Sequence, residues 1–134
     1  MIVRLDFPNP KLSPNRANGK HWAGLAALKA KAKADAHALT KNALQGRKSP
    51  YLDFKGDIPL SLFFVTPDKR HRDSDNLLAA SKHALDGVAL AIGVDDSRFR
   101  PILVDWGHGP DRIGALIVAV GVTISSGINL EVEA

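Results

Sequence analysis

The chain has 134 residues, of which 45% are hydrophobic and 24% are charged, which suits one domain with an ordinary buried core. It contains no cysteine, which excludes disulfides, zinc–thiolate sites, iron–sulfur clusters and a cysteine nucleophile. The net charge of +4 favours polyanionic partners slightly, although ordinary basic surface charge explains it equally well. The first residues carry no signal-peptide pattern and no apolar run is long enough to cross a membrane, so we expect a cytoplasmic protein.

The first half of the chain predicts a strand, a loop, a long helix and a second strand. Residues 1–7 alternate between polar and apolar side chains, which is typical of a half-buried strand, and the prolines of residues 8–20 predict a loop. Residues 21–44 are rich in alanine and lysine and predict a helix. Residues 58–66 are apolar on both sides, which predicts a central, covered strand.

The predicted first helix has an apolar side and a basic side. The 3.6-residue period places six apolar side chains on one face, which we expect to be buried: Leu25, Leu28, Ala32, Ala36, Leu39 and Ala43. The same period places four basic side chains on the outward side: Lys29, Lys33, His37 and Lys41.

The second half predicts another helix and two more strands. The helix is expected from residue 75 to about residue 91, with Ser74 or Asp73 as its cap and a weak point or break at Gly87. A turn at residues 93–97 leads to a strand at 98–106, which Pro101 interrupts. A glycine-rich connection at 107–111 and a strand at 113–124 follow, and residues 125–134 are expected to be a loosely held tail.

This order of elements predicts an α+β fold in a single domain that spans residues 1–134. The expected sheet is mixed and has four strands, in the chain order strand, helix, strand, helix, strand, strand, with the helices packed on it. The last two strands are expected to form an antiparallel hairpin, because a short glycine-rich connection joins them.

The stretch at residues 67–78 combines basic side chains with two carboxylates, and it leads from the second strand into the second helix. Its basic side chains attract phosphate, and Asp73 and Asp75 offer oxygen ligands to a hard cation such as Mg²⁺ or Mn²⁺. A site with both suits a metal-dependent enzyme that acts on nucleic acid. Taken singly, a basic run is usually a solvated loop and an Asp near a helix start is usually a cap.

Other sites with known sequence patterns are absent or incomplete. The pattern of an EF-hand calcium site is incomplete, because Leu78 stands at the position that requires glycine. The sequence contains no phosphate-binding P-loop and no dinucleotide-binding fingerprint. No nucleophile elbow supports a serine hydrolase, and the five histidines lack metal-ligand spacing. Asp95 and Asp96, considered alone, form an ordinary turn. They contribute to a metal site only if the fold brings them toward Asp73 and Asp75.

The stretch at 67–77, followed after one helix by Asp95 and Asp96, resembles the RusA-type Holliday junction resolvases. In that family a Pro-Asp-basic run leads to Arg-Asp-x-Asp-Asn-Leu, and an Asp-Asp turn follows the helix. The proline-rich loop with residues 13–15 and the nearby Trp22 is also similar to the family, as is the order of elements. The resemblance covers nearly the whole domain, and its specific part covers some 30 residues.

The resemblance implies a homodimeric, Mg²⁺-dependent endonuclease that resolves four-way DNA junctions by paired nicks, often prophage-encoded and expected with the nucleoid. It implies metal ligands at Asp73, Asp75 and Asp96, with Asp95 as a fourth. The side chains expected to contact DNA are Lys69, Arg70, Arg72, Arg16 and Lys20.

One position departs from the family pattern. The family has a lysine one turn after the second Asp, where this chain has Ala79. Lys82 lies on the same helical stripe and is expected to replace that lysine in part, as a catalytic residue, while Asp86 is expected to compete for it as an i, i+4 partner. Two other functions remain open: a non-catalytic or weakly active junction-binding protein, and a basic domain that binds an anionic protein or small molecule.

Overall fold

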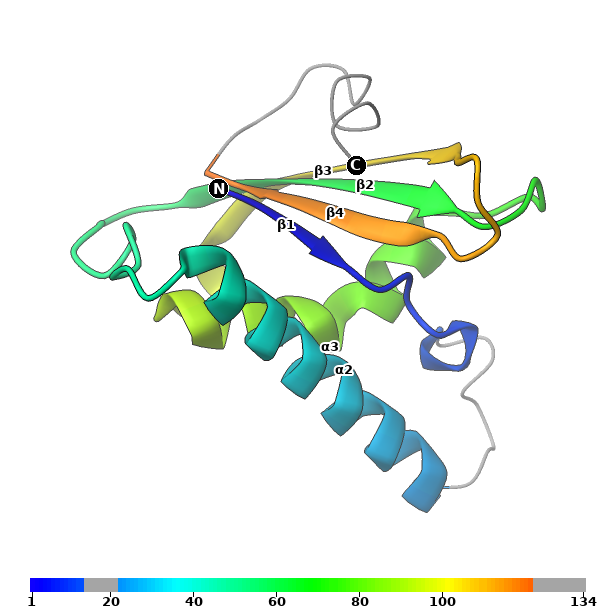
Figure 1. Cartoon of the computed structure of the whole chain (residues 1–134), viewed down its shortest axis with the longest axis horizontal. Helices are drawn as coiled ribbons and strands as arrows, with labels where there is room; N and C mark the ends of the chain where they lie inside the picture. Colours follow the sequence, from blue (N-terminus) through cyan, green and yellow to red (C-terminus); the bar gives the residue numbers. More distant parts are fainter. Residues whose placement is uncertain (14–21, 122–134) are drawn as a thin grey trace.

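Four strands form one mixed sheet in the computed structural model, and two long helices cover one of its faces (Figure 1). The structure describes residues 1–13 and 22–121. The strands are β1 (Ile2–Leu5), β2 (Ile58–Thr66), β3 (Phe99–His108) and β4 (Ala115–Val120), and the helices are α2 (Trp22–Leu44) and α3 (Ser74–Ile92). Two short 3-10 segments are η1 (Pro10–Leu12) and η2 (Asp96–Arg98). The predicted single-domain α+β fold is confirmed.

The strands lie in the order β1-β4-β2-β3. β3 runs parallel to β2, whereas β4 runs antiparallel to both β2 and β1. The predicted hairpin between the last two strands is therefore wrong, because β2 lies between them. The reason is that α3 carries the chain back along the sheet, so β3 starts beside the start of β2 and occupies one of its edges. β4 then pairs with the other edge of β2.

The core lies between the sheet and the two helices. Leu62 and Phe64 of β2 contact this core together with Val88 of α3, and all three are at most 1% exposed. Phe63 and Val65 point to the other face of the sheet and are also buried, in a second, smaller cluster. Both sides of β2 are covered, which confirms the prediction of a central, covered strand.

Helices α2 and α3 approach each other closely at Gly87. A Cβ atom added to Gly87 would lie 2.2 Å from the carbonyl oxygen of Lys33 and 3.0 Å from the backbone nitrogen of His37. The predicted break at Gly87 is wrong, since α3 continues without interruption to Ile92. The glycine is required here by the space between two helix backbones, not by a bend.

The buried side of α2 is rotated from the predicted one. Ala36, Thr40 and Leu44 are buried, whereas Leu39 and Ala43, both predicted to face the core, are exposed. Thr40 can be buried because its hydroxyl donates a hydrogen bond to the carbonyl oxygen of Ala36 at 2.7 Å. The contact with α3 through the small Gly87 thus determines which side of α2 is covered.

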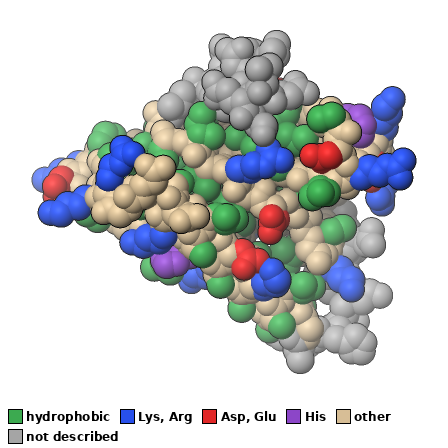
Figure 2. Space-filling model, viewed as in Figure 1, with side chains coloured by type: hydrophobic (Ala, Val, Ile, Leu, Met, Phe, Trp, Pro, Cys, Tyr) green, Lys and Arg blue, Asp and Glu red, His purple; other side chains and the backbone are tan. Residues whose placement is uncertain are grey.

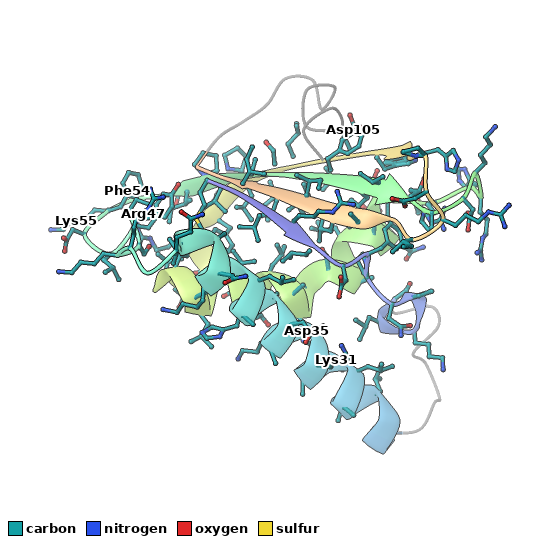
Figure 3. The ribbon with its side chains drawn as sticks, viewed as in Figure 1. Lys31, Asp35, Arg47, Phe54, Lys55 and Asp105 are labelled. Carbon is teal, nitrogen blue, oxygen red and sulfur yellow. The ribbon has the colours of Figure 1, made fainter. Side chains whose placement is uncertain are left out.

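Basic side chains gather at the two ends of the sheet. Lys and Arg side chains lie at both ends of the long axis in Figure 2, with hydrophobic, acidic and further basic side chains between them. Arg47, Phe54 and Lys55 lie at the end where β2 begins (Figure 3). Within residues 1–13 and 22–121, neither helix combines the length and apolar character that a membrane span needs. The tail predicted at residues 125–134 lies outside the described residues.

Candidate functional site

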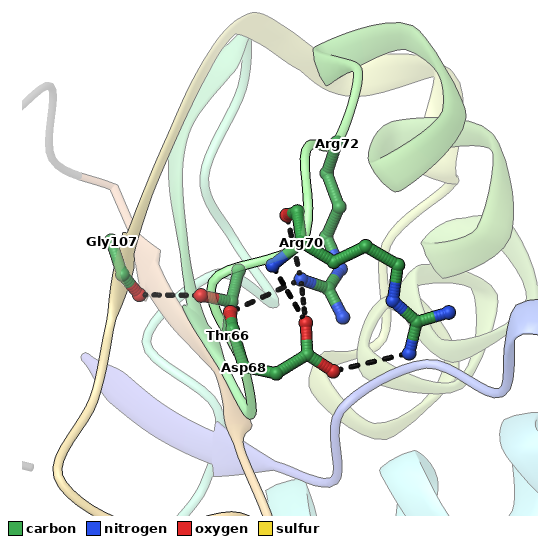
Figure 4. Close-up of polar contacts among 5 residues, drawn as sticks. All are labelled: Thr66, Asp68, Arg70, Arg72 and Gly107. Carbon is green, nitrogen blue, oxygen red and sulfur yellow. Dashed lines mark hydrogen bonds and ion pairs between the residues drawn. The ribbon is translucent and has the colours of Figure 1, made fainter.

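The loop between β2 and α3 is organised around the carboxylate of Asp68. This carboxylate accepts hydrogen bonds from the backbone nitrogen of Arg70 at 2.9 Å, from the Arg70 guanidinium at 3.1 Å and from the Arg72 guanidinium at 2.9 Å (Figure 4). The hydrogen bonds from Arg72 and Arg70 hold the pKa of Asp68 well below its usual range. One acidic residue therefore fixes the conformation of the basic loop.

Arg72 and Arg70 differ in how much they can offer to a ligand. The Arg72 side chain is only 16% exposed, donates to the carbonyl oxygens of Asp68 and Arg70, and lies over the ring of Phe7 at 5.4 Å. The Arg70 side chain is 71% exposed, and Lys69 is exposed beside it. Arg72 thus supports the loop, whereas Arg70 and Lys69 present their charges to solvent.

The first prediction concerns this support. Asp68→Asn should destabilise the protein at neutral pH, because the neutral amide cannot hold both guanidinium groups as the carboxylate does. The pKa of Asp68 is lowered in the folded protein, so the stabilisation is present above the ordinary Asp pKa of about 4 and is lost as the pH falls below it. Urea unfolding from pH 7 to pH 2 measures this, and a wild-type-minus-variant difference that does not shrink in acid would contradict the assignment.

A groove of about 370 Å³ separates the basic loop and the start of α3 from residues 7–13. Arg70, His71, Asp73 and Asn76 line it on one side, and Pro8 lies on the other. Asp73 occupies the N-cap position of α3, but its side chain makes no capping hydrogen bond, so the predicted capping role is wrong for this carboxylate. It is exposed within a groove that basic side chains also line.

Asp75 lies in the first turn of α3 and is exposed. Because residues four apart are neighbours on a helix, Asp75 lies next to Ala79 along the stripe that continues to Lys82 and Asp86. Asp73 and Asp75 therefore present two exposed carboxylates at the start of the helix. The N-terminal end of a helix favours negative charge, so their position costs little stability.

The second acidic group, Asp95 and Asp96, lies in the segment between α3 and β3. Asp95 accepts a hydrogen bond from the backbone nitrogen of Ser97 at 2.9 Å, which lowers its pKa. Asp96 lies beside Asp86 and Asp95, and its pKa is raised mainly by the side chain of Asp86, with smaller contributions from desolvation and from Asp95. Like charges packed this closely form a region of negative potential that a cation would relieve.

A shallow groove of about 220 Å³ brings Asp96 together with Ala79 and Lys82. Lys82 is exposed, and no ion pair between Lys82 and Asp86 is present in the described part of the chain. The predicted competition by Asp86 is therefore wrong. The reason is that Asp86 faces Asp96 instead, so the ammonium group of Lys82 remains available to the groove.

The structure thus joins the predicted site residues in two groups rather than one. Asp73 and Asp75 stand where α3 begins, whereas Asp96 follows α3 in the chain and lies beside Asp86, in the groove that Ala79 and Lys82 also line. In residues 1–13 and 22–121, no three His, Cys, Asp or Glu side chains are arranged to hold one metal ion. Arg16 and Lys20 lie outside the described residues.

Comparison with known proteins finds a relative of similar length in Xylella fastidiosa. The chain is 30% identical over 127 residues to an uncharacterized protein from Xylella fastidiosa (strain Temecula1 / ATCC 700964), and the match covers 93% of this chain and 80% of that protein. The chain belongs to the family of this Xylella fastidiosa protein. No family model matches the chain.

The name of the Xylella fastidiosa relative states no activity, so the chemistry of this family member rests on its own residues. Two features of the site were missed at the level of sequence. Asp86 was expected to pair with Lys82, but it lies beside Asp96. Phe7, two residues after β1, supports the guanidinium of Arg72. No sequence signal links these pairs, because each contact joins segments that only the fold brings together.

Proposed function

We propose that the chain is a metal-dependent endonuclease of the RusA type that cuts four-way DNA junctions by paired nicks. The observation that carries this proposal is the arrangement at the start of α3, where the exposed carboxylates of Asp73 and Asp75 directly follow a basic loop whose arginines are hydrogen-bonded to Asp68. Basic side chains bind phosphate, and the neighbouring carboxylates are ligands for a hard cation. The arrangement suits hydrolysis of a phosphodiester.

The acidic side chains fit Mg²⁺ or Mn²⁺ in their chemistry, because all four candidate ligands are exposed carboxylates: Asp73, Asp75, Asp95 and Asp96. When bound, the metal ion would activate a water molecule and neutralise charge on a phosphate oxygen. The protein's own contribution is positioning. Arg70 holds the phosphate backbone beside the carboxylates, and Lys82 supplies positive charge next to Asp96.

The proposed enzyme acts as a homodimer in the cytoplasm, in association with the nucleoid. A four-way junction presents two symmetry-related strands, and a dimer with two-fold symmetry matches that geometry. Each subunit then cuts one strand. Paired nicking needs both sites on the same junction.

A labelled four-way junction tests the proposal directly. Incubation with Mg²⁺ should give two symmetric nicks, EDTA should stop the reaction, and a linear duplex of the same sequence should be cut much more slowly. A junction that is bound tightly but never cut would favour the second candidate, a non-catalytic junction-binding protein. Ala79, which stands where the family has a lysine, is the observation that favours this second candidate.

A second prediction concerns the positive charge near Asp96. Ala79→Lys should raise the rate of junction cleavage, because a lysine in this groove can reach a phosphate beside the acidic groups and stabilise charge that develops in the transition state. Lys82→Ala should lower the single-turnover rate roughly tenfold, with little loss of junction binding. Single-turnover kinetics with saturating enzyme measures both. Unchanged cleavage by Lys82→Ala would remove Lys82 from the mechanism.

A further inference from the structure

A second groove lies at the same end of the sheet, on the opposite side of the basic loop from the groove that contains Asp73. It has a volume of about 520 Å³ and runs between the loop after β2, at Pro67 to Lys69, and the loop after β3, at His108 to Arg112. The loop at residues 67–73 thus forms a ridge with one groove on each side. None of the residues of the loop after β3 belongs to the proposed catalytic site.

The two walls of this groove are fixed to each other. The hydroxyl of Thr66 donates a hydrogen bond to the carbonyl oxygen of Gly107 at 3.2 Å (Figure 4), and the backbone nitrogen of Gly109 donates to the carbonyl oxygen of Thr66 at 3.2 Å. A Cβ atom on Gly109 would lie 2.3 Å from a methyl group of Val65, so the loop after β3 packs tightly on β2. A ligand in the groove meets walls that are already in place.

Both acidic residues of the groove are engaged by local contacts. Asp68 holds the two arginines of the ridge, and Asp111 accepts hydrogen bonds from the backbone nitrogens of Ile113 and Gly114 at 3.1 and 3.0 Å. By contrast, Lys69 and Arg112 are exposed and form no ion pair or hydrogen bond with the described residues. The ammonium group of Lys69 and the guanidinium group of Arg112 are therefore available to a ligand in the groove.

We infer that Lys69 and Arg112, which line this groove together with His108, form a second binding site for the phosphate backbone of nucleic acid. The ligand is a polyanion rather than one small anion, because the positive side chains continue over the ridge through Arg70 into the groove that contains Asp73. A strand crossing the ridge meets cations on both sides of it. The choice of DNA as the ligand rests on the proposed function, but binding at this site does not require that the DNA is cut.

Two matched double variants test this site. Lys69→Ala/Arg112→Ala removes one lysine and one arginine from the groove, and Lys55→Ala/Arg47→Ala removes the same pair of residue types from the opposite end of the sheet (Figure 3). Both variants change the net charge equally. Junction and duplex affinities are measured in EDTA at several salt concentrations, so that binding is observed without cleavage.

The groove variant should bind both DNA forms about tenfold more weakly at moderate salt. The slope of log Kd against the logarithm of the salt concentration should fall by about 2, because two phosphate contacts are lost. The control variant should keep the wild-type slope. The swap Lys69→Arg/Arg112→Lys should also keep it, since the charges are retained. An equal loss of DNA affinity in the groove and control variants would overturn the inference. So would an unchanged salt slope in the groove variant.

The outcome is separable from that of the proposed function. If the wild-type protein binds junctions and never cuts them, the nuclease proposal fails, while a reduced slope in the groove variant still supports the second phosphate site. If the wild-type protein cuts junctions and the groove variant binds DNA like wild type, the proposal of a second phosphate site is refuted and the nuclease proposal is supported. A wild-type protein that binds no DNA overturns both.

Discussion

We expect Asp75→Asn to abolish junction cleavage while junction binding is kept or strengthened. Asp75 is exposed in the first turn of α3, directly after the basic loop. The change removes one charged oxygen ligand at almost constant size, and losing several kcal/mol of transition-state stabilisation corresponds to about a thousandfold or more in rate. Binding improves because one carboxylate no longer repels the phosphates.

The measurement combines single-turnover cleavage in Mg²⁺ with binding in EDTA. Asp57→Asn is the matched control, because Asp57 is also exposed but lies at the other end of β2. We expect that control to cut at the wild-type rate. The variant should fold normally, since the favourable interaction of Asp75 with the helix end contributes only about 0.3–1 kcal/mol. Wild-type cleavage by Asp75→Asn would refute the role of this carboxylate.

The second large effect is expected at Gly87. Replacing glycine with alanine inside an exposed helix normally stabilises a protein by up to about 1 kcal/mol. At Gly87 the new methyl group would lie 2.2 Å from the carbonyl oxygen of Lys33, and because that atom belongs to the backbone, α2 and α3 must move apart. We expect Gly87→Ala to lower the free energy of unfolding by about 1–3 kcal/mol.

Gly24→Ala provides the control, since Gly24 lies in α2 with no atom within 4 Å of an added Cβ. It should leave stability unchanged or raise it slightly. Urea unfolding of both variants and of the wild-type protein gives the comparison. Equal effects of the two substitutions would show that the helices tolerate a methyl group at their contact.

Helices and strands that are marked by local sequence patterns could be predicted from the sequence. β2 begins at Ile58 and ends at Thr66 as expected, because its continuous apolar run is bounded by Pro67. The start of α3 was also predictable from the polar residues around Asp73. The pairing of β3 was not, because a glycine-rich connection indicates a turn without saying which edge of β2 each strand will occupy.

The candidate site was predictable in its residues but not in its geometry. The sequence places Asp73 and Asp75 next to a basic loop, and the structure places them so. Whether Asp96 approaches them depends on the length of α3 and on the parallel pairing of β3, neither of which follows from spacing. The sequence also cannot show that Arg72 supports the loop while Arg70 is exposed, because that difference depends on contacts with Asp68 and Phe7.

The position of β4 has a consequence for how the chain folds. β4 is inserted between β1 and β2, so among the strands of residues 1–13 and 22–121 β1 pairs only with β4, which comes last in the chain. The amino group of Met1 donates to the carbonyl oxygen of Val120, across a separation of 119 residues. Contacts of such long range slow folding, because the chain pays the entropy of closing a large loop before it gains them. The sheet is therefore completed late in folding, and a chain still being synthesised keeps β1 unpaired until residue 120 has emerged from the ribosome.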